Sequence, residues 1–423
     1  MTAPTKDFTA IARHLFQIAV EQANPARALR AALQQTPLPF LPAGGRTLVL
    51  ALGKAAVPMM RCALAHVPAV QRALAITNRE NASLIEGAEL ICGAHPIPDA
   101  SSAYAGRAIV DLAKAAGPRD RLIVLLSGGA SALAVVPAAG LPLQDKITAW
   151  GLLLRSGMDI AQMNLIRQHL SDLKGGGLAR HAAPASVISF VLSDVIGNDL
   201  RAIASGPTAS ALGSRAQACA LLRQAGLWQE LPASVRSHLA QDTPYAAQAP
   251  ATHVLIGSNR QSLDAMAQAA RRLMPTKVIS ECLTGDVAHA AEMIVAAAQK
   301  AAAGAPVALL AGGETTVRIT GKGQGGRNQE LALRVALLAQ GRLPRGWVFL
   351  SGGTDGRDGP TDSAGGLVDA QVVPRIRAAG ANPEALLANN DSYTALHLGQ
   401  GQLITGATGT NVADMQVMLL PGP

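Results

Sequence analysis

The chain has 423 residues, of which 49% are hydrophobic and only 15% charged, so it is expected to fold into a compact protein with enough length for two domains. Its formal net charge is +8, but the basic residues are scattered and aromatic residues make up only 3%, which favours small anionic substrates over a nucleic acid. Four isolated cysteines, an N-terminus without an apolar leader and uncharged runs broken by glycine and proline predict a soluble cytoplasmic protein with no membrane partner.

Helices and strands are predicted to alternate through the first half of the chain. An amphipathic pattern predicts helix from about residue 7 to residue 33. Buried strands are then predicted near 47–52, 73–77, 122–126 and 187–192. Helical stretches separate these strands near 54–65, 100–116 and 145–173. This alternation is typical of βαβ units and of a parallel sheet.

The pattern fades in the Pro- and Ala-rich stretch 241–250 and resumes after it. Strands are predicted near 252–257, 277–281 and 307–311, and helices near 259–273 and 286–302. A loss of periodicity in a segment of this composition indicates a linker. The sequence therefore predicts two α/β domains with largely parallel sheets, covering residues 1–245 and 250–423.

Four predicted strands end in glycine followed by a small or charged residue. The segments are Gly53-Lys54, Ser127-Gly128-Gly129-Ala130-Ser131, Gly312-Gly313-Glu314 and Ser351-Gly352-Gly353-Thr354-Asp355. Glycine lets the backbone approach a ligand closely, and ligands of open α/β sheets bind beyond the carboxyl ends of the strands. These strand ends predict a site for a small phosphorylated or otherwise anionic ligand.

Two cations stand at predicted turns. Lys54 follows a buried strand directly, where a ligand contact is expected rather than a merely solvated ammonium group. Arg327 stands where the helix from 328 to 340 is predicted to begin. A cation opposes the dipole at a helix N-terminus, so an anion is expected beside Arg327. The alternative is an exposed arginine paired with Glu330 on the same helix.

Gly321, Gly323 and Gly326 fit the spacing G-x-G-x-x-G between a short strand predicted over 316–320 and the helix that follows. A dinucleotide site would also require an acidic residue at the end of the next strand to bind the ribose. That strand is followed by no acid before Asp355. The sequence therefore argues against a nicotinamide dinucleotide at this motif.

A polar stripe runs along the end of the predicted helix 145–173. Asn164, Arg167, Ser171 and Lys174 are spaced to share one helical face, and no acid stands among them. The helix is expected to end at the glycines 175–177. The stripe is either an anion-facing surface or an ordinary solvated face.

Carboxylates collect in the loops after the predicted strands. Asp194 follows the strand 187–192, Glu314 follows Gly313, and Asp355, Asp358 and Asp362 follow the strand that ends in Ser351-Gly352. Carboxylates opposite lysine and arginine suit a magnesium–phosphate site, in which few protein ligands hold the metal. For Asp358, a role in forming the turn is favoured.

Short motifs run in order through nearly the whole chain. They are Ala51-Leu-Gly-Lys-Ala55, His95-Pro-Ile-Pro-Asp99, Leu126-Ser-Gly-Gly-Ala-Ser131, Lys174-Gly-Gly-Gly-Leu178, Ser193-Asp-Val-Ile-Gly-Asn198, Ala204-Ser-Gly-Pro-Thr208, Gly325-Gly-Arg-Asn-Gln-Glu330, Ser351-Gly-Gly-Thr-Asp355 and Thr408-Gly-Thr-Asn411. Together they resemble the class II glycerate kinases, which are glycerate 2-kinases with a C-terminal MOFRL domain. The resemblance implies two α/β domains, the N-terminal one Rossmann-like, with the active site in the cleft between them.

The resemblance also implies phosphorylation of D-glycerate to 2-phosphoglycerate with ATP and a divalent metal such as Mg²⁺. The family's important lysine and arginine fall on Lys54 and Arg327. Asp194 is the candidate metal ligand or acceptor of the hydroxyl proton, and Asp355 is a second candidate ligand. The residues expected to contact glycerate or nucleotide are Gly53, Ser127, Gly128, Gly129, Ser131, Asn164, Arg167, Lys174, Glu314, Gly325, Gly326, Asn328, Gly352, Gly353 and Asp355.

Two other functions remain open from the sequence. Some relatives carry the name hydroxypyruvate reductase, and hydroxypyruvate differs from glycerate by a hydride at C2. The missing ribose-binding acid argues against that reaction. A non-catalytic sensor of a sugar phosphate or nucleotide is the third possibility, although it would leave the carboxylates without a chemical task. The oligomeric state stays open.

Overall fold

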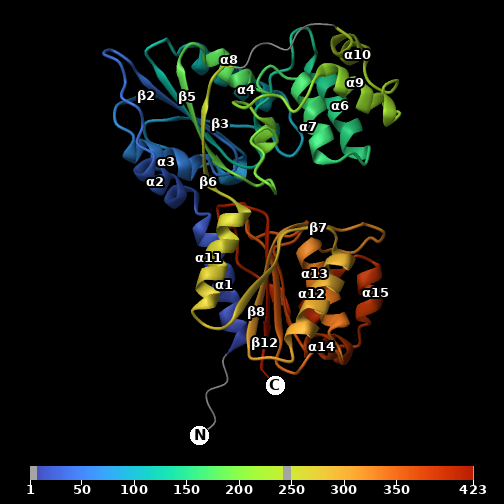
Figure 1. The fold of residues 1–423 in the computed structure, drawn as a ribbon. Coiled ribbons are helices and arrows are strands. Elements are labelled where there is room, and N and C mark those ends of the chain that lie inside the picture. The colour runs from blue at the N-terminus through green and yellow to red at the C-terminus, as the bar shows by residue number, and fades with distance from the viewer. Residues whose placement is uncertain (1–6, 242–248, 423) are drawn as a thin grey trace. The chain divides into compact units, whose positions relative to one another are not determined.

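The computed structural model describes residues 7–241 and 249–422, which form two compact units (Figure 1). The first unit is Pro25–Ile256, and the second joins the residues up to Asn24 to those from Gly257 onward. This division differs from the predicted 1–245 and 250–423 because helix α1 (Phe8–Gln22) packs with the C-terminal half of the chain. Most of the predicted linker 241–250, namely residues 242–248, lies outside the described residues.

The first unit contains a six-stranded sheet in the order β3-β2-β1-β4-β5-β6. Its strands are β1 (Thr47–Leu52), β2 (Val70–Thr77), β3 (Glu89–Cys92), β4 (Arg121–Leu126), β5 (Ser186–Leu192) and β6 (Thr252–Gly257). The pairings from β3 to β5 are all parallel. This is the strand order of the Rossmann fold, so the predicted α/β class and its Rossmann-like N-terminal half are confirmed.

Helices surround this sheet and form a smaller cluster beside it. They are α2 (Pro25–Gln35), α3 (Ala56–His66), α4 (Ala100–Lys114), α5 (Ala130–Leu133), α6 (Leu143–Arg155), α7 (Ile160–His169), α8 (Gly177–Ala182), α9 (Arg215–Gln224) and α10 (Ala233–Leu239). Apolar residues of β1, β2, β4 and β5 form the main core with α4 and α8. Leu153, Ile166, Leu222 and Val235 belong to a separate small core that joins α6, α7, α9 and α10.

The helix predicted over 145–173 is two helices. Gly157 lies between them with a φ of 72°, and Asp159 then caps α7 by accepting the Gln162 backbone N–H at 2.8 Å. A positive φ breaks the helical conformation and is costly for residues other than glycine, so the helix ends where Gly157 adopts it. Helix α7 stops at His169, so Ser171 and Lys174 are not on a helical face as predicted.

The second unit contains a mixed sheet in the order β11-β10-β9-β12-β8-β7. Its strands are β7 (Thr276–Asp286), β8 (Val307–Thr316), β9 (Val348–Gly353), β10 (Gly365–Asp369), β11 (Gln402–Leu403) and β12 (Asp414–Leu420). Only β7 and β8 pair in parallel, and β12 lies antiparallel between β8 and β9. The prediction of a largely parallel sheet is wrong for this unit, because the last strand inserts between two strands that run the other way.

Helices cover both faces of the mixed sheet. They are α1 and α11 (Asn259–Arg271) on one face, and α12 (Val287–Ala301) and α13 (Arg327–Leu338) on the other (Figure 1). Helices α14 (Val372–Ala378), α15 (Pro383–Ala388) and α16 (Ser392–Leu398) follow β10. No strand forms over 317–320, where a short one was predicted. Of the helices in the described ranges, none combines the length and the hydropathy that a membrane crossing requires.

Candidate functional site

The carboxyl ends of β1 and β4 meet at the point where the strand order of the first sheet reverses. The Lys54 backbone N–H donates to the Gly128 carbonyl at 2.9 Å, and the Ala55 N–H donates to Ser127 Oγ at 3.1 Å. A Cβ atom at Gly53, whose φ is +131°, would collide with Ser127. The two loops therefore touch only because residue 53 is glycine. This switch point is where open α/β sheets bind ligands.

Asp194, His95 and the Lys54 side chain surround the glycine pair of this loop. A Cβ at Gly128 would collide with the Asp194 carboxylate, and a Cβ at Gly129 would press on Lys54 and His95. Burial raises the pKa of Asp194 above its ordinary value, and a backbone hydrogen bond and the nearby Lys54 ammonium offset only part of this rise. Partial burial and the same ammonium lower the pKa of His95. The arrangement places one cation, one carboxylate and one imidazole around the backbone of the glycine turn.

The polar residues predicted on the 145–173 stripe come together through other contacts. Asn164 and Lys174 are buried, and Arg167 donates to Asn164 Oδ1 at 3.0 Å. Lys174 Nζ donates to the Ser131 carbonyl at 3.1 Å, which links it to the glycine loop. Ser171 instead donates to the Val136 carbonyl at 3.2 Å. Asn164 and Arg167 therefore share a face of α7 as predicted, whereas Lys174 joins the switch-point loop from beyond the end of that helix.

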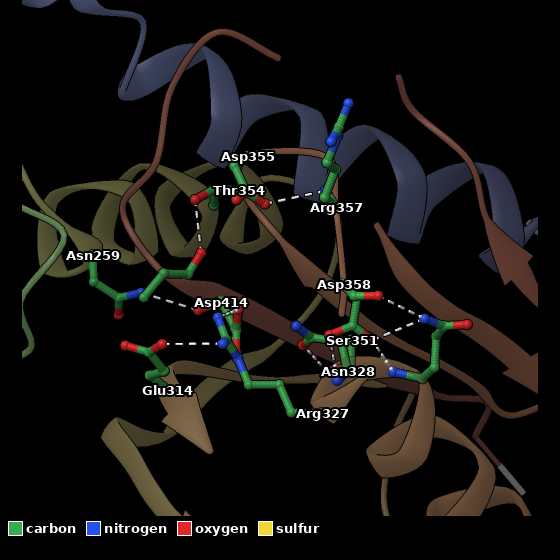
Figure 2. Close-up of polar contacts among 12 residues, drawn as sticks. Asn259, Glu314, Arg327, Asn328, Ser351, Thr354, Asp355, Arg357, Asp358 and Asp414 are labelled. Carbon is green, nitrogen blue, oxygen red and sulfur yellow. Dashed lines mark hydrogen bonds and ion pairs between the residues drawn. The ribbon is translucent and has the colours of Figure 1, made fainter. Parts of the chain in front are cut away.

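The second unit has its own polar edge, where β8 and β9 end and β12 begins (Figure 2). Arg327 donates from Nε and a terminal nitrogen to Asp414, at 2.6 and 2.9 Å. Its other terminal nitrogen lies 3.1 Å from a Glu314 oxygen. Burial opposes the charge of Arg327, but Asp414 and Glu314 together raise the pKa of its guanidinium. The anion expected beside Arg327 is thus a pair of carboxylates from the protein, whereas Glu330 pairs with Arg334.

Asp358 satisfies the N-terminus of α13 (Figure 2). Its carboxylate accepts the backbone N–H groups of Asn328 and Gln329 at 3.1 and 2.8 Å. Burial raises its pKa to about 6, although these two hydrogen bonds work in the opposite direction. Asn328 is fully buried and accepts a hydrogen bond of 2.6 Å from Ser351. Asp358 and Asn328 therefore hold the helix start against the end of β9.

The glycines of the second unit approach the protein itself. A Cβ at Gly325 would collide with Ser392, at Gly326 with Asp358, at Gly352 with Phe16 and Leu403, and at Gly353 with the Arg357 carbonyl. The motif glycines 321 and 323 lie against residues 389–391 in the same way. These close contacts within the protein explain why glycine is required at these positions, so no bound dinucleotide is needed to account for them. This agrees with the missing ribose-binding acid.

The two candidate metal ligands belong to different units, Asp194 to the first and Asp355 to the second. Asp355 accepts the Arg357 backbone N–H at 3.1 Å (Figure 2). Across the described ranges no three His, Cys, Asp or Glu side chains gather in a metal-binding group. The joint metal role stays a prediction. One or two carboxylates suffice for Mg²⁺ when phosphate oxygens complete its shell, so Asp194 fits the chemistry of such a cation.

Sequence reasoning missed four residues that the structure places in these clusters. Asp414 opens β12 and Lys146 lies within α6, and neither stretch carries a local signal of a site. His95 was visible only as part of a motif. Asp358 was assigned to a turn, and its capping of α13 could not be read from a separation of 30 residues.

Comparison with known proteins gives matches over the whole chain. Residues 11–240 match a domain of unknown function, DUF4147, and residues 307–414 match the MOFRL family. The chain is 33% identical to the D-glycerate 2-kinase of Thermotoga maritima over 97% of this chain and 98% of that protein. It is 35% identical to a protein of Agrobacterium vitis named "Putative hydroxypyruvate reductase", over 97% and 94%. The crystal structure of glycerate kinase from Thermotoga maritima superposes with a TM-score of 0.89 at 33% identity, covering 98% of this chain and all of that one.

Proposed function

This chain belongs to the glycerate kinase family with DUF4147 and MOFRL domains, and from that premise we propose that it phosphorylates D-glycerate at the C2 hydroxyl with ATP. The product of this reaction is 2-phosphoglycerate. The observation that carries the proposal is the convergence of Lys54, the glycine turn 127–129 and Asp194 at the switch point of the first sheet. This combination offers a cation, a glycine backbone that can be approached closely and a carboxylate to an anionic substrate and a hydroxyl group.

Phosphoryl transfer depends on positioning and charge neutralisation more than on covalent chemistry. When bound, ATP with Mg²⁺ supplies the phosphoryl group and part of the neutralising charge. Lys54 neutralises the glycerate carboxylate or the transferring group, since its ammonium lies beside the glycine turn and forms no ion pair within the part of the chain that the structure describes. Asp194 accepts the proton of the C2 hydroxyl on a carboxylate oxygen. Its raised pKa makes it a better base than an ordinary exposed aspartate.

A coupled assay distinguishes the proposal from the alternative reaction. Purified protein should phosphorylate D-glycerate with ATP, lose this activity with a metal chelator and regain it with Mg²⁺. A ³¹P spectrum of the product separates 2-phosphoglycerate from 3-phosphoglycerate. The name of the Agrobacterium vitis relative supports a second candidate, NAD(P)H-dependent reduction of hydroxypyruvate. Reduction of hydroxypyruvate by metal-free protein without any kinase activity would overturn the proposal.

Replacement of Lys54 tests the assignment of the site. Lys54→Met should lower kcat/KM by roughly 10²–10³-fold, the usual loss for one preorganised charge-stabilising group. The matched control is Lys114→Met, because Lys114 is an exposed lysine in the last turn of α4. The control should keep full activity. Equal activity of both variants would remove Lys54 from the site.

The remaining predicted contacts keep the status of proposals. Arg327, Glu314 and Asp355 belong to the second unit, and a role for them in binding glycerate or nucleotide stays a prediction. The contacts of Arg327 with Asp414 and Glu314 support a role in ordering this edge of the sheet.

A further inference from the structure

Three cationic side chains of the first unit lie close together, with Lys146 and Lys174 buried and Arg167 half-buried, and two of them contact one indole ring. The Arg167 guanidinium carbon lies 3.5 Å from the centroid of the Trp150 ring, and Lys174 Nζ lies 5.4 Å from it. Lys146 is 4% exposed and Lys174 is 2% exposed. Within residues 7–241 and 249–422, none of the three forms an ion pair with a carboxylate. Lysine and arginine are almost never buried without a partner, so this cationic cluster requires an explanation.

Several hydrogen-bond donors of the cluster have no acceptor among the described residues. Arg167 uses one terminal nitrogen for Asn164, while its Nε and its other terminal nitrogen are buried without a partner among the described residues. Lys146 Nζ donates to the Leu170 carbonyl at 2.6 Å, and Lys174 Nζ to the Ser131 carbonyl. A guanidinium group has five N–H donors and an ammonium group three, so most donors of the cluster have no hydrogen-bond acceptor among the described residues.

A strained turn holds this cluster in place. Ala204, Ser205 and Gly206 have consecutive φ values of 53°, 60° and 61°. Ser205 Oγ donates to Asn164 Oδ1 at 3.0 Å and lies 2.8 Å from Ser131 Oγ. Positive φ is costly for alanine and serine, and such strain is concentrated at functional sites. The turn therefore fixes Asn164, to which Arg167 donates, beside Ser131 of the glycine loop. The carbonyl of the same Ser131 accepts the hydrogen bond from Lys174.

We propose that the cationic cluster of Lys146, Arg167 and Lys174 is a preformed site for a small oxyanion, either a carboxylate or a phosphate group. Unpaired donors on a planar guanidinium and two ammonium groups match the oxygens of such an anion. Because Ser131 connects the cluster to the loop around Lys54, the anion is a group of the substrate or product, an assignment that rests on the proposed function. Anion binding itself does not depend on that function.

The charged groups destabilise the protein as long as no anion neutralises them. Burial lowers the pKa of Lys146 to about 7 and that of Arg167 to about 9, and mutual repulsion adds to the effect for the lysines. Removing one of these charges should therefore leave the ligand-free protein as stable as before or more stable. Replacing a residue whose role was purely structural would instead lower the stability of the ligand-free protein.

The test measures thermal unfolding of the full chain without nucleotide, with inorganic phosphate, sulfate, acetate or D-glycerate added. The wild type should unfold at a higher temperature with at least one of these anions. Arg167→Met should unfold no earlier than the wild type without anion, and its apparent Kd for that anion should rise at least tenfold, as expected when a charged hydrogen-bonding group is lost. Arg155→Met, which changes an exposed arginine at the end of α6, should match the wild type.

Each outcome decides the proposal. A response to phosphate and sulfate alone assigns a phosphate subsite, and a response to acetate or D-glycerate assigns a carboxylate subsite. If Arg167→Met does not fold, Lys146→Met takes its place. Failure of both variants to fold, or the same anion response in wild type and variant, would overturn the proposal. Anion binding by a protein without kinase activity would refute the proposed function and leave the cluster intact.

Discussion

Arg327 holds two carboxylates at the edge of the second sheet. Asp414 is 0% exposed, and both of its oxygens receive N–H groups from the one guanidinium. Glu314 contacts the same arginine from the end of β8. Since a buried carboxylate without its partner is strongly destabilising, Arg327 contributes to stability whatever else it does.

We therefore expect Arg327→Lys to destabilise the protein although the charge is kept. A lysine ammonium cannot reproduce the two parallel hydrogen bonds, so the free energy of unfolding should fall by about 1–3 kcal/mol. Urea unfolding followed by circular dichroism measures this loss. Arg318→Lys, at an exposed arginine in the loop after β8, is the control and should behave as the wild type. An unchanged midpoint in Arg327→Lys would mean that the pair with Asp414 adds nothing to stability.

Among the elements, helix α13 depends on a single carboxylate at its start. Asp358 binds two N–H groups of the first turn, while burial works against its charge. The helix dipole favours an anion at this position, so Asp358 is well placed to cap the helix. Its burial, however, opposes ionisation of the carboxyl group.

The raised pKa of Asp358 predicts a specific pH dependence of stability. Its folded pKa of about 6 lies above the ordinary value of 3.8, so the folded protein binds this proton more tightly than the unfolded chain. The resulting stabilisation is complete below about pH 4 and is lost as the pH rises through 6. Asp358→Asn cannot lose a proton. From pH 4 to pH 7 the wild type should thus lose stability relative to this variant, by on the order of 3 kcal/mol.

Urea unfolding of both proteins across this pH range gives the comparison. The other titrating groups are shared, so they cancel in the difference between the two curves. Two parallel curves would show that Asp358 titrates normally.

The contact between the ends of β1 and β4 is the second feature at the scale of elements. It depends on Gly53, where a Cβ would meet the Ser127 hydroxyl and main chain. We expect Gly53→Ala to lower the unfolding free energy by about 1–3 kcal/mol and to lower kinase activity, because the loop 127–129 must move. Gly226→Ala is the control for backbone strain alone, since Gly226 has a φ of +73° with open space around it. Equal losses in both variants would exclude a steric role for Gly53.

At the scale of the whole molecule, the two units do not follow the two halves of the chain. Helix α1 precedes the first unit in sequence but packs on α11, β9 and β12 of the second. Leu15 and Phe16 are buried there, and Thr410 Oγ1 donates to the Ala23 carbonyl at 2.5 Å. The second unit therefore needs both ends of the chain.

Deletion of residues 1–24 should loosen the second unit alone. The loss of two buried large side chains costs about 1.5–3 kcal/mol each. Hydrogen exchange followed by mass spectrometry should show faster exchange in β9 and β12, with β1 and β4 unchanged. Faster exchange in β1 and β4, or none in β9 and β12, would contradict this assignment of α1.

Local pattern determined much of the first unit. Strands such as 47–52 and 122–126 are buried on both faces, so their sequences are continuous apolar runs that can be recognised without a partner. The glycines after them stand at the ends of these strands, and Lys54 and Asp194 follow strands as the sequence predicted. These features depend on a few adjacent residues, which is why the sequence shows them.

Tertiary structure decided what depends on distant residues. The insertion of β12 between β8 and β9, the return of α1 to the second unit and the pairing of Arg327 with a carboxylate 87 residues away leave no local periodicity. The glycine at 157 divided a predicted helix and brought Arg167 and Lys174 into one cationic cluster with Lys146 by a path that helical spacing does not describe. Such contacts form when whole helices and strands pack together, and the free energy of that packing depends on residues far apart in the sequence. No single segment therefore predicts them.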